Sequence, residues 1–309
     1  MKSEVTKKMS LESEQIPKDL MLIEKQKSGL RRNLTQIDKT IRFELRKGFR
    51  TFLFICFVFV GIFTIYFIIQ ELLLFQEVAL PDDPIVFISQ YLDMFGFIVI
   101  LSAAGFAGSI IAEDFHKQTG NLLFPKISKR NLLIGRIISR YALNALCVII
   151  YYILVGIVTF IKYEEIPLVF WGSMGWALLY TFMIFTFVTF LSSLMKSTSI
   201  TIIVSVLFML ILFNMITMIF VFAGLKIEPL FIITYYEGII SASMAMPDPR
   251  YAEIMMPMGQ GQNGMGGMAS FFSWSTPSEA AALIGMLILI SIFLGSAYFL
   301  YRRRQSKSE

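Results

Sequence analysis

Charged residues are scarce in this chain. Asp, Glu, Lys and Arg make up 16% of its 309 residues, whereas a soluble domain carries about 25%. Hydrophobic residues make up 56%, and the mean hydropathy is +0.69. These values exclude an ordinary soluble protein and predict an integral membrane protein. The net charge of +5 does not indicate a nucleic-acid partner, because in a membrane protein the position of the charges matters more than their sum.

Histidine and cysteine are nearly absent too. His116 is the single histidine, so a Ser-His-Asp or Cys-His catalytic set would have to use it, and no nucleophile elbow accompanies it. Cys56 and Cys147 lie in apolar runs without a CxxC spacing, which predicts packing residues and no disulfide framework. The G-x-x-x-x-G-K-[ST] phosphate loop is also missing. We therefore predict that the chain is not an enzyme, holds no cofactor and does not itself hydrolyse a nucleotide.

The sequence has long apolar runs instead. A helix needs about 20 apolar residues to cross a bilayer. Six spans are predicted, at about 51–70, 94–112, 137–161, 167–195, 197–225 and 279–301. A single Asp, Lys or Arg at a span centre costs about 2.5–3.5 kcal/mol on insertion scales, and none of the six centres carries one. The runs are too long for barrel strands and do not alternate, so the predicted fold class is an all-α integral membrane protein.

Lysine and arginine are distributed unevenly between the two sides of the membrane. Of the 27 in the chain, 24 lie in residues 1–50, in 113–140, at Lys196 or in 302–309. The other side holds Lys162, Lys226 and Arg250. The positive-inside rule therefore predicts that both termini and the loop after the second span face the cytoplasm.

The region before the first span has an amphipathic pattern. Apolar residues recur at spacings of three and four, at Leu34, Ile37, Ile41, Leu45 and Phe49, and Arg42 and Arg46 lie on the other side. This pattern predicts an interfacial helix on anionic membrane lipid, with a bend at Gly48. A cytoplasmic extension of the first span is the alternative. The predicted membrane domain is 35–304, between a loosely ordered cytoplasmic tail at 1–34 and a short tail at 305–309.

A long outer segment, 226–278, precedes the sixth span. Its first part, EPLFIITYYEGIISA, is apolar but too short to cross the membrane, which predicts a re-entrant or surface helix. Its Gly-rich middle carries methionines, among them Met255, Met256, Met258, Met265 and Met268. Thioether sulfur suits Cu(I), but methionine, glycine and glutamine together also make an adaptable surface, which is the favoured interpretation.

A few small and polar residues interrupt the apolar spans. Arg136, Arg140 and Asn144 are four residues apart and share one helix face. We interpret the arginines as snorkelling to the headgroups and Asn144 as bonding a neighbouring helix. Small residues in the second span predict close helix packing, within the subunit or across a dimer. The candidate pathway or dimer-interface residues are Ser102, Gly105, Gly108, Asn144, Asn214 and Thr217.

The loop after the second span carries the most specific pattern. Glu113 ends the span, and Thr119-Gly120, Leu122-Leu123, Pro125 and Ser128-Lys129-Arg130 follow in that order. Combined with six spans, cytoplasmic ends, an amphipathic helix before the first span and a long outer segment before the sixth, this pattern resembles the permease subunit of type-2 ATP-binding-cassette (ABC) exporters. The resemblance covers most of residues 35–304.

The resemblance implies a multi-pass permease of the plasma membrane that forms its pathway as a homodimer or heterodimer, lined by the second and fifth spans. A separate cytoplasmic ATPase would bind ATP and Mg²⁺, and the loop would dock on it as a short helix. The residues expected to couple the two proteins are Glu113, Asp114, Lys117, Thr119, Gly120, Leu122, Leu123, Phe124, Pro125, Ser128, Lys129 and Arg130. Of these, Glu113, Lys129 and Arg130 are expected to be exposed.

Other functions stay open at this point. One is a copper-linked ABC permease that uses the outer methionines, and another is a membrane scaffold or signalling protein whose loop binds a different partner. An intramembrane enzyme is disfavoured by the single histidine and by the lack of acids at the span centres. No span carries a distinctive charged or aromatic site, so lipid, peptide, polysaccharide and drug all remain candidate substrates.

Overall fold

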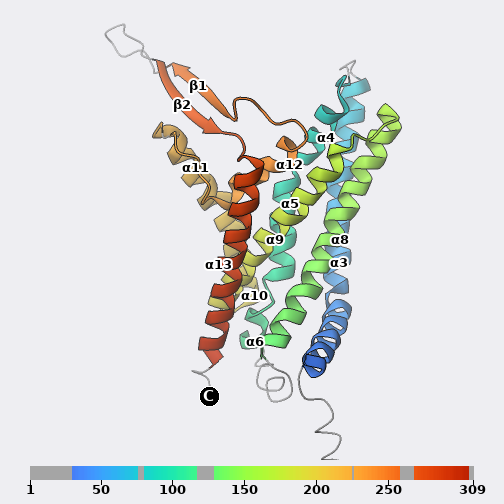
Figure 1. Cartoon of the computed structure of the whole chain (residues 1–309). Coiled ribbons are helices and arrows are strands. Elements are labelled where there is room, and N and C mark those ends of the chain that lie inside the picture. The colour runs from blue at the N-terminus through green and yellow to red at the C-terminus, as the bar shows by residue number, and fades with distance from the viewer. Residues whose placement is uncertain (1–29, 76–79, 117–128, 225, 258–267, 306–309) are drawn as a thin grey trace, which may run out of the picture.

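The computed structural model describes residues 30–75, 80–116, 129–224, 226–257 and 268–305. Within this part, six helices are long and apolar enough to cross a membrane: Asn33–Leu73, Pro84–Asp114, Arg130–Tyr163, Val169–Leu194, Thr198–Phe222 and Glu279–Arg303. They confirm the six predicted spans and the all-α class. The basic ends of the spans lie together at the lower side of Figure 1, which we call the cytoplasmic end.

Several spans are built from more than one helical element. The first is α3 (Leu30–Phe75), the third α8 (Lys129–Tyr163), the fourth α9 (Val169–Leu194) and the sixth α13 (Glu279–Gln305). The second consists of α4 (Pro84–Leu92), α5 (Phe95–Ala107) and α6 (Ala112–His116). The fifth consists of α10 (Thr198–Leu207), the π-helical turn η1 (Phe208–Leu212) and α11 (Phe213–Phe222). π-helical turns are rare and frequently occur at functional sites.

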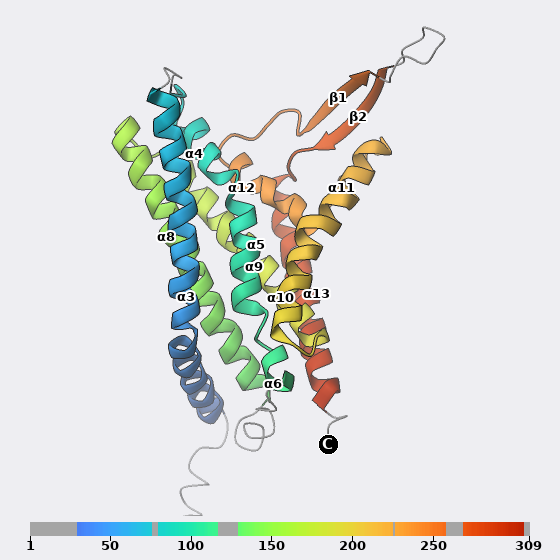
Figure 2. The same cartoon turned by 180° about the vertical axis from the view of Figure 1, so that it is seen from behind.

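The second and fourth spans form the centre of the bundle. In each, 72% of the most apolar 18-residue window is buried, compared with 22% in the first and sixth spans and 11% in the fifth. Figure 2 shows α5 and α9 between α3 and α8 on one side and α10 and α13 on the other. The outer spans therefore present their apolar side chains to lipid or to another protein. Cys56 and Cys147 are both free, as predicted, and pack with their sulfur atoms 3.4 Å apart.

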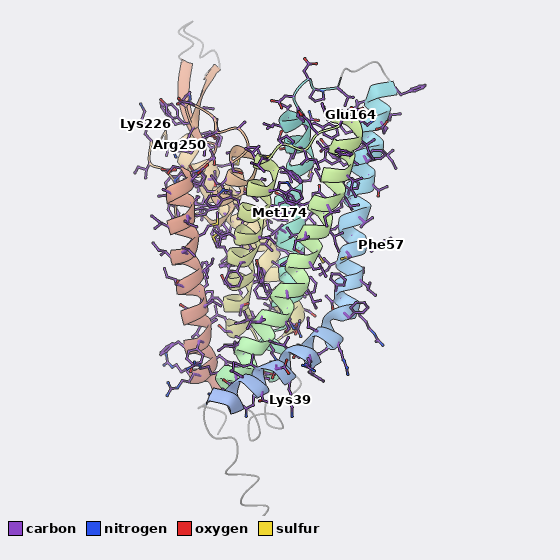
Figure 3. All side chains as sticks on the ribbon, turned by 45° about the vertical axis from the view of Figure 1, so that its right-hand side comes forward. Lys39, Phe57, Glu164, Met174, Lys226 and Arg250 are labelled. Carbon is purple, nitrogen blue, oxygen red and sulfur yellow. The ribbon has the colours of Figure 1, made fainter. Side chains whose placement is uncertain are left out.

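The predicted interfacial helix is the first part of α3 and not a separate element. The helix is continuous through Gly48, but its ribbon bends between the part with Lys39 and the part with Phe57 (Figure 3). Its apolar stripe is not its buried face, since Leu34 and Phe49 are more than half exposed. The buried face instead carries Thr40, Glu44 and Gly48, which lie against α8.

The outer segment combines short helices with a hairpin. Its first part forms η2 (Ile233–Glu237) and α12 (Gly238–Ala242), which agrees with the predicted short helical element. Strands β1 (Tyr251–Pro257) and β2 (Met268–Trp274) then pair antiparallel, from Tyr251 opposite Trp274 to Pro257 opposite Met268. The hairpin was not predicted, because the sequence indicated an irregular Gly-rich segment here. Met255 and Met256 lie in β1 and Met268 begins β2, whereas Met258 and Met265 lie outside the described residues.

Candidate functional site

The second span is interrupted just above the cytoplasmic end. Helix α5 ends at Ala107, residues 108–111 form turns, and α6 begins at Ala112. The hydroxyl of Ser192 on α9 accepts the backbone N–H groups of Ile111 and Ala112 at 3.1 and 3.0 Å and donates to the carbonyl of Gly108 at 3.0 Å. Broken helices are tolerated in membranes where such polar groups satisfy the freed backbone.

Arg136 of α8 lies against this interruption. Its Nη1 donates to the Ile110 carbonyl at 2.9 Å and to Asp114 Oδ2 at 2.7 Å, and its Nε donates to Glu44 Oε1 at 3.1 Å. The three side chains are at most 6% exposed. Arg136 therefore connects α3, the broken second span and α8.

Arg140 lies one turn further along α8 and repeats the arrangement. Its Nη2 donates to Glu44 Oε2 at 2.9 Å, and its Nη1 donates to the Phe106 carbonyl at 3.3 Å and to the Ser109 hydroxyl. Glu113 Oε2 lies 3.7 Å from Arg140 and accepts a hydrogen bond from Lys47 at 2.6 Å. Because the two arginines share Glu44, neither can move without changing the contacts of the other.

The sixth span joins the same cluster through Tyr301 of α13. The Tyr301 hydroxyl donates to Asp114 Oδ2 at 3.0 Å, the oxygen that also accepts from Arg136. Three carboxylates therefore face three cations, and four helical elements meet there. We call Glu44, Lys47, Glu113, Asp114, Arg136, Arg140 and Tyr301 the cytoplasmic network. Removing one partner of a buried ion pair costs about 3–5 kcal/mol, because the other charge is left uncompensated.

The cytoplasmic network corrects two interpretations made from the sequence. Arg136 and Arg140 do not snorkel, since both are buried and paired with acids from other elements. Asp114 is buried and Glu113 is largely covered, so the acidic start of the loop is not simply exposed. Glu44, Lys47 and Tyr301 were missed. Glu44 did leave a signal, because it is an acid seven residues after Ile37 and therefore lies beside the apolar stripe.

Only part of the predicted coupling loop can be placed. Lys129 begins α8, and Arg130 follows it and is exposed, as expected. The remaining predicted coupling residues lie outside the described residues: Lys117, Thr119, Gly120, Leu122, Leu123, Phe124, Pro125 and Ser128. The described part of the loop therefore consists of its two ends. The first end carries the network residues Glu113 and Asp114, and the second end leads into α8, which carries Arg136 and Arg140.

The small residues of the second span pack inside the chain. A Cβ atom at Gly105 would lie 3.1 Å from Ile55 of α3, and one at Gly108 would lie 2.8 Å from Ile202 of α10. Ser102 donates to the Val99 carbonyl of its own helix at 3.0 Å. Asn144 is fully buried, but its amide has no hydrogen-bond partner among the described residues, so the predicted bond to a neighbouring helix is wrong.

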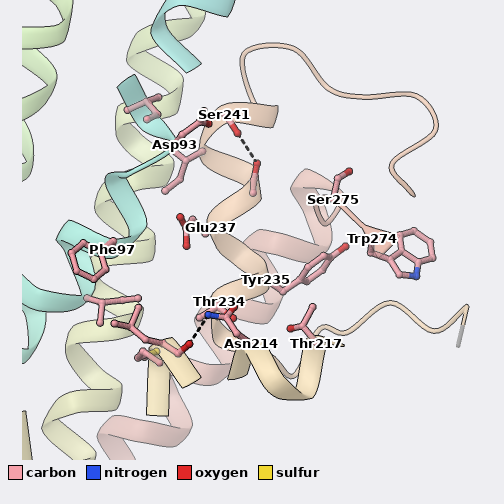
Figure 4. A pocket seen from close by; sticks show the side chains of 16 residues that line it. Asp93, Phe97, Asn214, Thr217, Thr234, Tyr235, Glu237, Ser241, Trp274 and Ser275 are labelled. Atoms are coloured by element: carbon pink, nitrogen blue, oxygen red, sulfur yellow. Dashed lines mark hydrogen bonds between the residues drawn. The ribbon is translucent and has the colours of Figure 1, made fainter. Parts of the chain in front are cut away.

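Asn214 and Thr217 belong to a different region, a cavity of about 450 Å³ at the outer end. It lies between the second span, the fifth span at η1 and α11, the η2–α12 segment and the end of β2. Figure 4 shows Glu237 projecting from η2 toward the ribbon of the second span, where Phe97 lies. We call this cavity the outer pocket. Its polar lining includes Asp93, Asn214, Thr217, Thr234, Tyr235 and Glu237.

Comparison with known proteins decides the family. A sequence model described as ABC-2 family transporter protein matches residues 9–306. The chain belongs to the ABC-2 transporter family. No match is found among curated proteins. An ABC-2 member is the membrane permease of an ABC transporter and is not the ATPase, so this chain works with a cytoplasmic ABC ATPase.

Proposed function

We propose that this ABC-2 permease is one half of a plasma-membrane exporter, and that the cytoplasmic network transmits motion from the ATPase to the spans. The loop that begins at Glu113 and ends at Arg130 docks on the ATPase. Closure of the ATPase subunits then moves α6, and the network passes this movement to the first, third and sixth spans. The observation that carries the proposal is that one buried cluster joins α3, α6, α8 and α13, and that the two ends of this loop lead into α6 and α8.

A second permease subunit completes the pathway in this proposal. The fifth span has only 11% of its apolar window buried, and its Asn214 is exposed and, among the described residues, donates only to the Leu210 carbonyl of its own span, at 2.8 Å. A polar amide on a lipid-facing surface is costly, whereas an aqueous pathway between two permeases would solvate it. Spans two and five border the outer pocket together, which agrees with the pathway position that the family resemblance implies.

Glu44→Gln tests the transmission role. The change keeps the shape of the side chain but removes the charge that Arg136 and Arg140 share. We expect the variant to co-purify with its ATPase but to lose most of the permease-dependent change in ATP hydrolysis, measured as the ratio of the rates with and without the permease. Asp38→Asn is the matched control, because Asp38 lies on the same helix in an exposed pair with Arg42.

Two results would contradict the proposal. If a phosphate-loop ATPase never co-purifies with the chain, the exporter assignment fails, and a membrane scaffold becomes the better interpretation. If Glu44→Gln and Asp38→Asn give the same rate ratio, the network does not transmit motion. The copper-linked alternative stays a prediction, and a normal growth response to copper after deletion of residues 255–268 would count against it.

A further inference from the structure

The outer pocket has the size of a small-molecule site. Ligand pockets are typically about 300–1,000 Å³, and this one has a volume of about 450 Å³. Its walls come from four separate parts of the chain, which are the second span, the fifth span, η2–α12 and β2. A cavity built where several elements converge can change shape when the spans move, so it is a suitable place to hold and release a transported compound.

Both charged residues that line the outer pocket are acidic. These are Asp93 and Glu237, and no lysine, arginine or histidine occurs among the described residues that line the cavity. The two cations of the outer segment are engaged by other groups. Arg250 pairs with Glu228 at 3.3 Å and lies 5.8 Å from the ring of Trp274 at the edge of the pocket, and the Lys226 ammonium lies 4.3 Å from the centre of the Phe272 ring.

Glu237 is held in place by uncharged groups. Tyr180 of α9 donates to its Oε2 at 3.4 Å, and the backbone N–H of Gly96 donates to the carboxylate from the second span. Gly96 is required for this approach, because a Cβ atom there would lie within 2.2 Å of the carboxylate atoms. These donors orient the carboxylate but supply no positive charge. A carboxylate removed from water is costly unless a cation pairs with it.

The rest of the lining suits an apolar molecule. Phe97, Tyr235 and Trp274 contribute aromatic side chains, and Leu92, Ile100 and Met209 contribute aliphatic or thioether surface. Phe97 is 42% exposed even though it lies in a transmembrane helix of the central span. Aromatic faces also attract cations, by about 0.5–2 kcal/mol depending on desolvation. An anionic centre inside an aromatic and aliphatic wall is complementary to an organic cation.

We propose that the outer pocket binds an organic cation with an apolar body, whose charged group pairs with the carboxylates of Glu237 and Asp93 and whose body packs against Phe97 and Trp274. If the proposed exporter function holds, such compounds are the transported cargo, and the pocket is their last site before release. The binding itself requires no ATPase.

The test is equilibrium binding of rhodamine 6G, a fluorescent cation, to the full-length permease in nanodiscs of uncharged phosphatidylcholine. Fluorescence polarisation at pH 8 should show saturable binding that tetraphenylphosphonium displaces and the anion tetraphenylborate does not. Glu237→Gln should weaken binding tenfold or more. Asp93→Asn, at an exposed position where the fold tolerates the change, should weaken it at least threefold. Glu71→Gln, at an outer carboxylate that does not line the pocket and pairs with Lys162, should leave it within twofold.

Lowering the pH should weaken rhodamine 6G binding, as Glu237→Gln does. Burial and the neighbouring Asp93 raise the pKa of Glu237 to about 7, against the opposing effect of the hydrogen bonds from Tyr180 and Gly96. Tyr235 and Asp93 are the other titratable groups that line the pocket. Because Glu237 loses its charge as the pH falls through 7, wild-type affinity should drop between pH 8 and pH 6, and the affinity of Glu237→Gln should change much less.

Three results would overturn the inference: no saturable binding to the wild-type chain, equal affinity of wild type, Glu237→Gln and Asp93→Asn, or displacement by tetraphenylborate as effective as by tetraphenylphosphonium. None of them would affect the coupling experiment with Glu44→Gln. Conversely, normal cation binding by a chain that never associates with an ATPase would refute the exporter proposal alone.

Discussion

Glu44 and Asp114 in the cytoplasmic network and Glu237 in the outer pocket are carboxylates with little access to water, but the two sites differ in how the charge is balanced. In the network, three carboxylates face three cations, and every ion pair joins different helical elements. In the pocket, Glu237 accepts from the neutral donors Tyr180 and Gly96, Asp93 adds a second carboxylate, and no cation occurs among the described lining residues. Because its carboxylates are paired with cations, the network stabilises one arrangement of helices. The negative charge of the pocket is instead neutralised by protonation or by a bound cation.

Breaking the balanced cluster should have the largest effect. Arg136→Gln removes the cation that Glu44, Asp114 and the Ile110 carbonyl share. We expect the folded state to lose about 3–5 kcal/mol, measured by thermal unfolding of the purified chain. Arg42→Gln is the control, because Arg42 is exposed on the same side of the membrane. A melting temperature for Arg136→Gln equal to that of the control would show that the network contributes little to stability.

The stability of the folded chain should depend on pH because of Glu237 in the outer pocket. Burial raises the pKa of Glu237 from 4.5 to about 7. Between pH 4.5 and pH 7, the folded chain therefore binds more protons than the unfolded chain. Stability contributed by the protonated carboxyl is therefore lost as the pH rises through this range. The expected loss is about 1–3 kcal/mol, read as a fall in melting temperature from pH 5 to pH 8 that Glu237→Gln lacks.

Wild type and Glu237→Gln share every other titrating group. A difference between their melting-temperature profiles with pH therefore comes from Glu237. If the melting temperatures of wild type and Glu237→Gln change in parallel with pH, the pKa of Glu237 is not raised in the folded chain. The outer pocket would then not be a desolvated acidic site.

Exposed ion pairs at the two ends should have the smallest effect. Asp38 pairs with Arg42 at the cytoplasmic end at 3.2 Å, and Glu71 pairs with Lys162 at the outer end at 2.5 Å. Water and salt screen such pairs, which contribute about 0–1 kcal/mol each. The free energies of unfolding of Asp38→Asn and Glu71→Gln should therefore lie within about 1 kcal/mol of the wild-type value. A larger loss in either variant would mean that burial does not explain the difference between the network and the surface pairs.

The spans and their direction could be predicted from the sequence because both depend on local quantities. Transfer of about 20 apolar residues into lipid and the count of nearby lysines and arginines need no tertiary information. The family pattern in the loop is also local. The cytoplasmic network is different, because Glu44 and Arg136 are 92 residues apart and pair only once α3 and α8 have packed. From the sequence alone, a basic residue near a span end is indistinguishable from a snorkelling one.

The outer pocket was missed for a related reason. Glu237 lies in an apolar segment too short to span, so a search for charges at span centres passes over it, and Asp93 lies one residue before the predicted second span. Their proximity depends on Gly96 leaving room for the carboxylate. The β1–β2 hairpin was missed because the Gly-rich residues between the strands directed the interpretation toward an irregular segment. Asn214 and Thr217 were found, since polar residues in a charge-free span are conspicuous.

The interruption at residues 108–111 also decides which parts of the permease behave as one rigid body. A continuous second span would act as a lever, and any tilt at the loop would reappear at the outer end. With the break closed by the Ser192 hydroxyl, α6 contacts α9, α8, α3 and α13 through hydrogen bonds and ion pairs. It connects to α5 through a turn and through Arg140, which bonds the Phe106 carbonyl. If the proposed coupling role holds, force applied at the loop would reach the surrounding helices first, and α5, which borders the outer pocket, would follow their displacement.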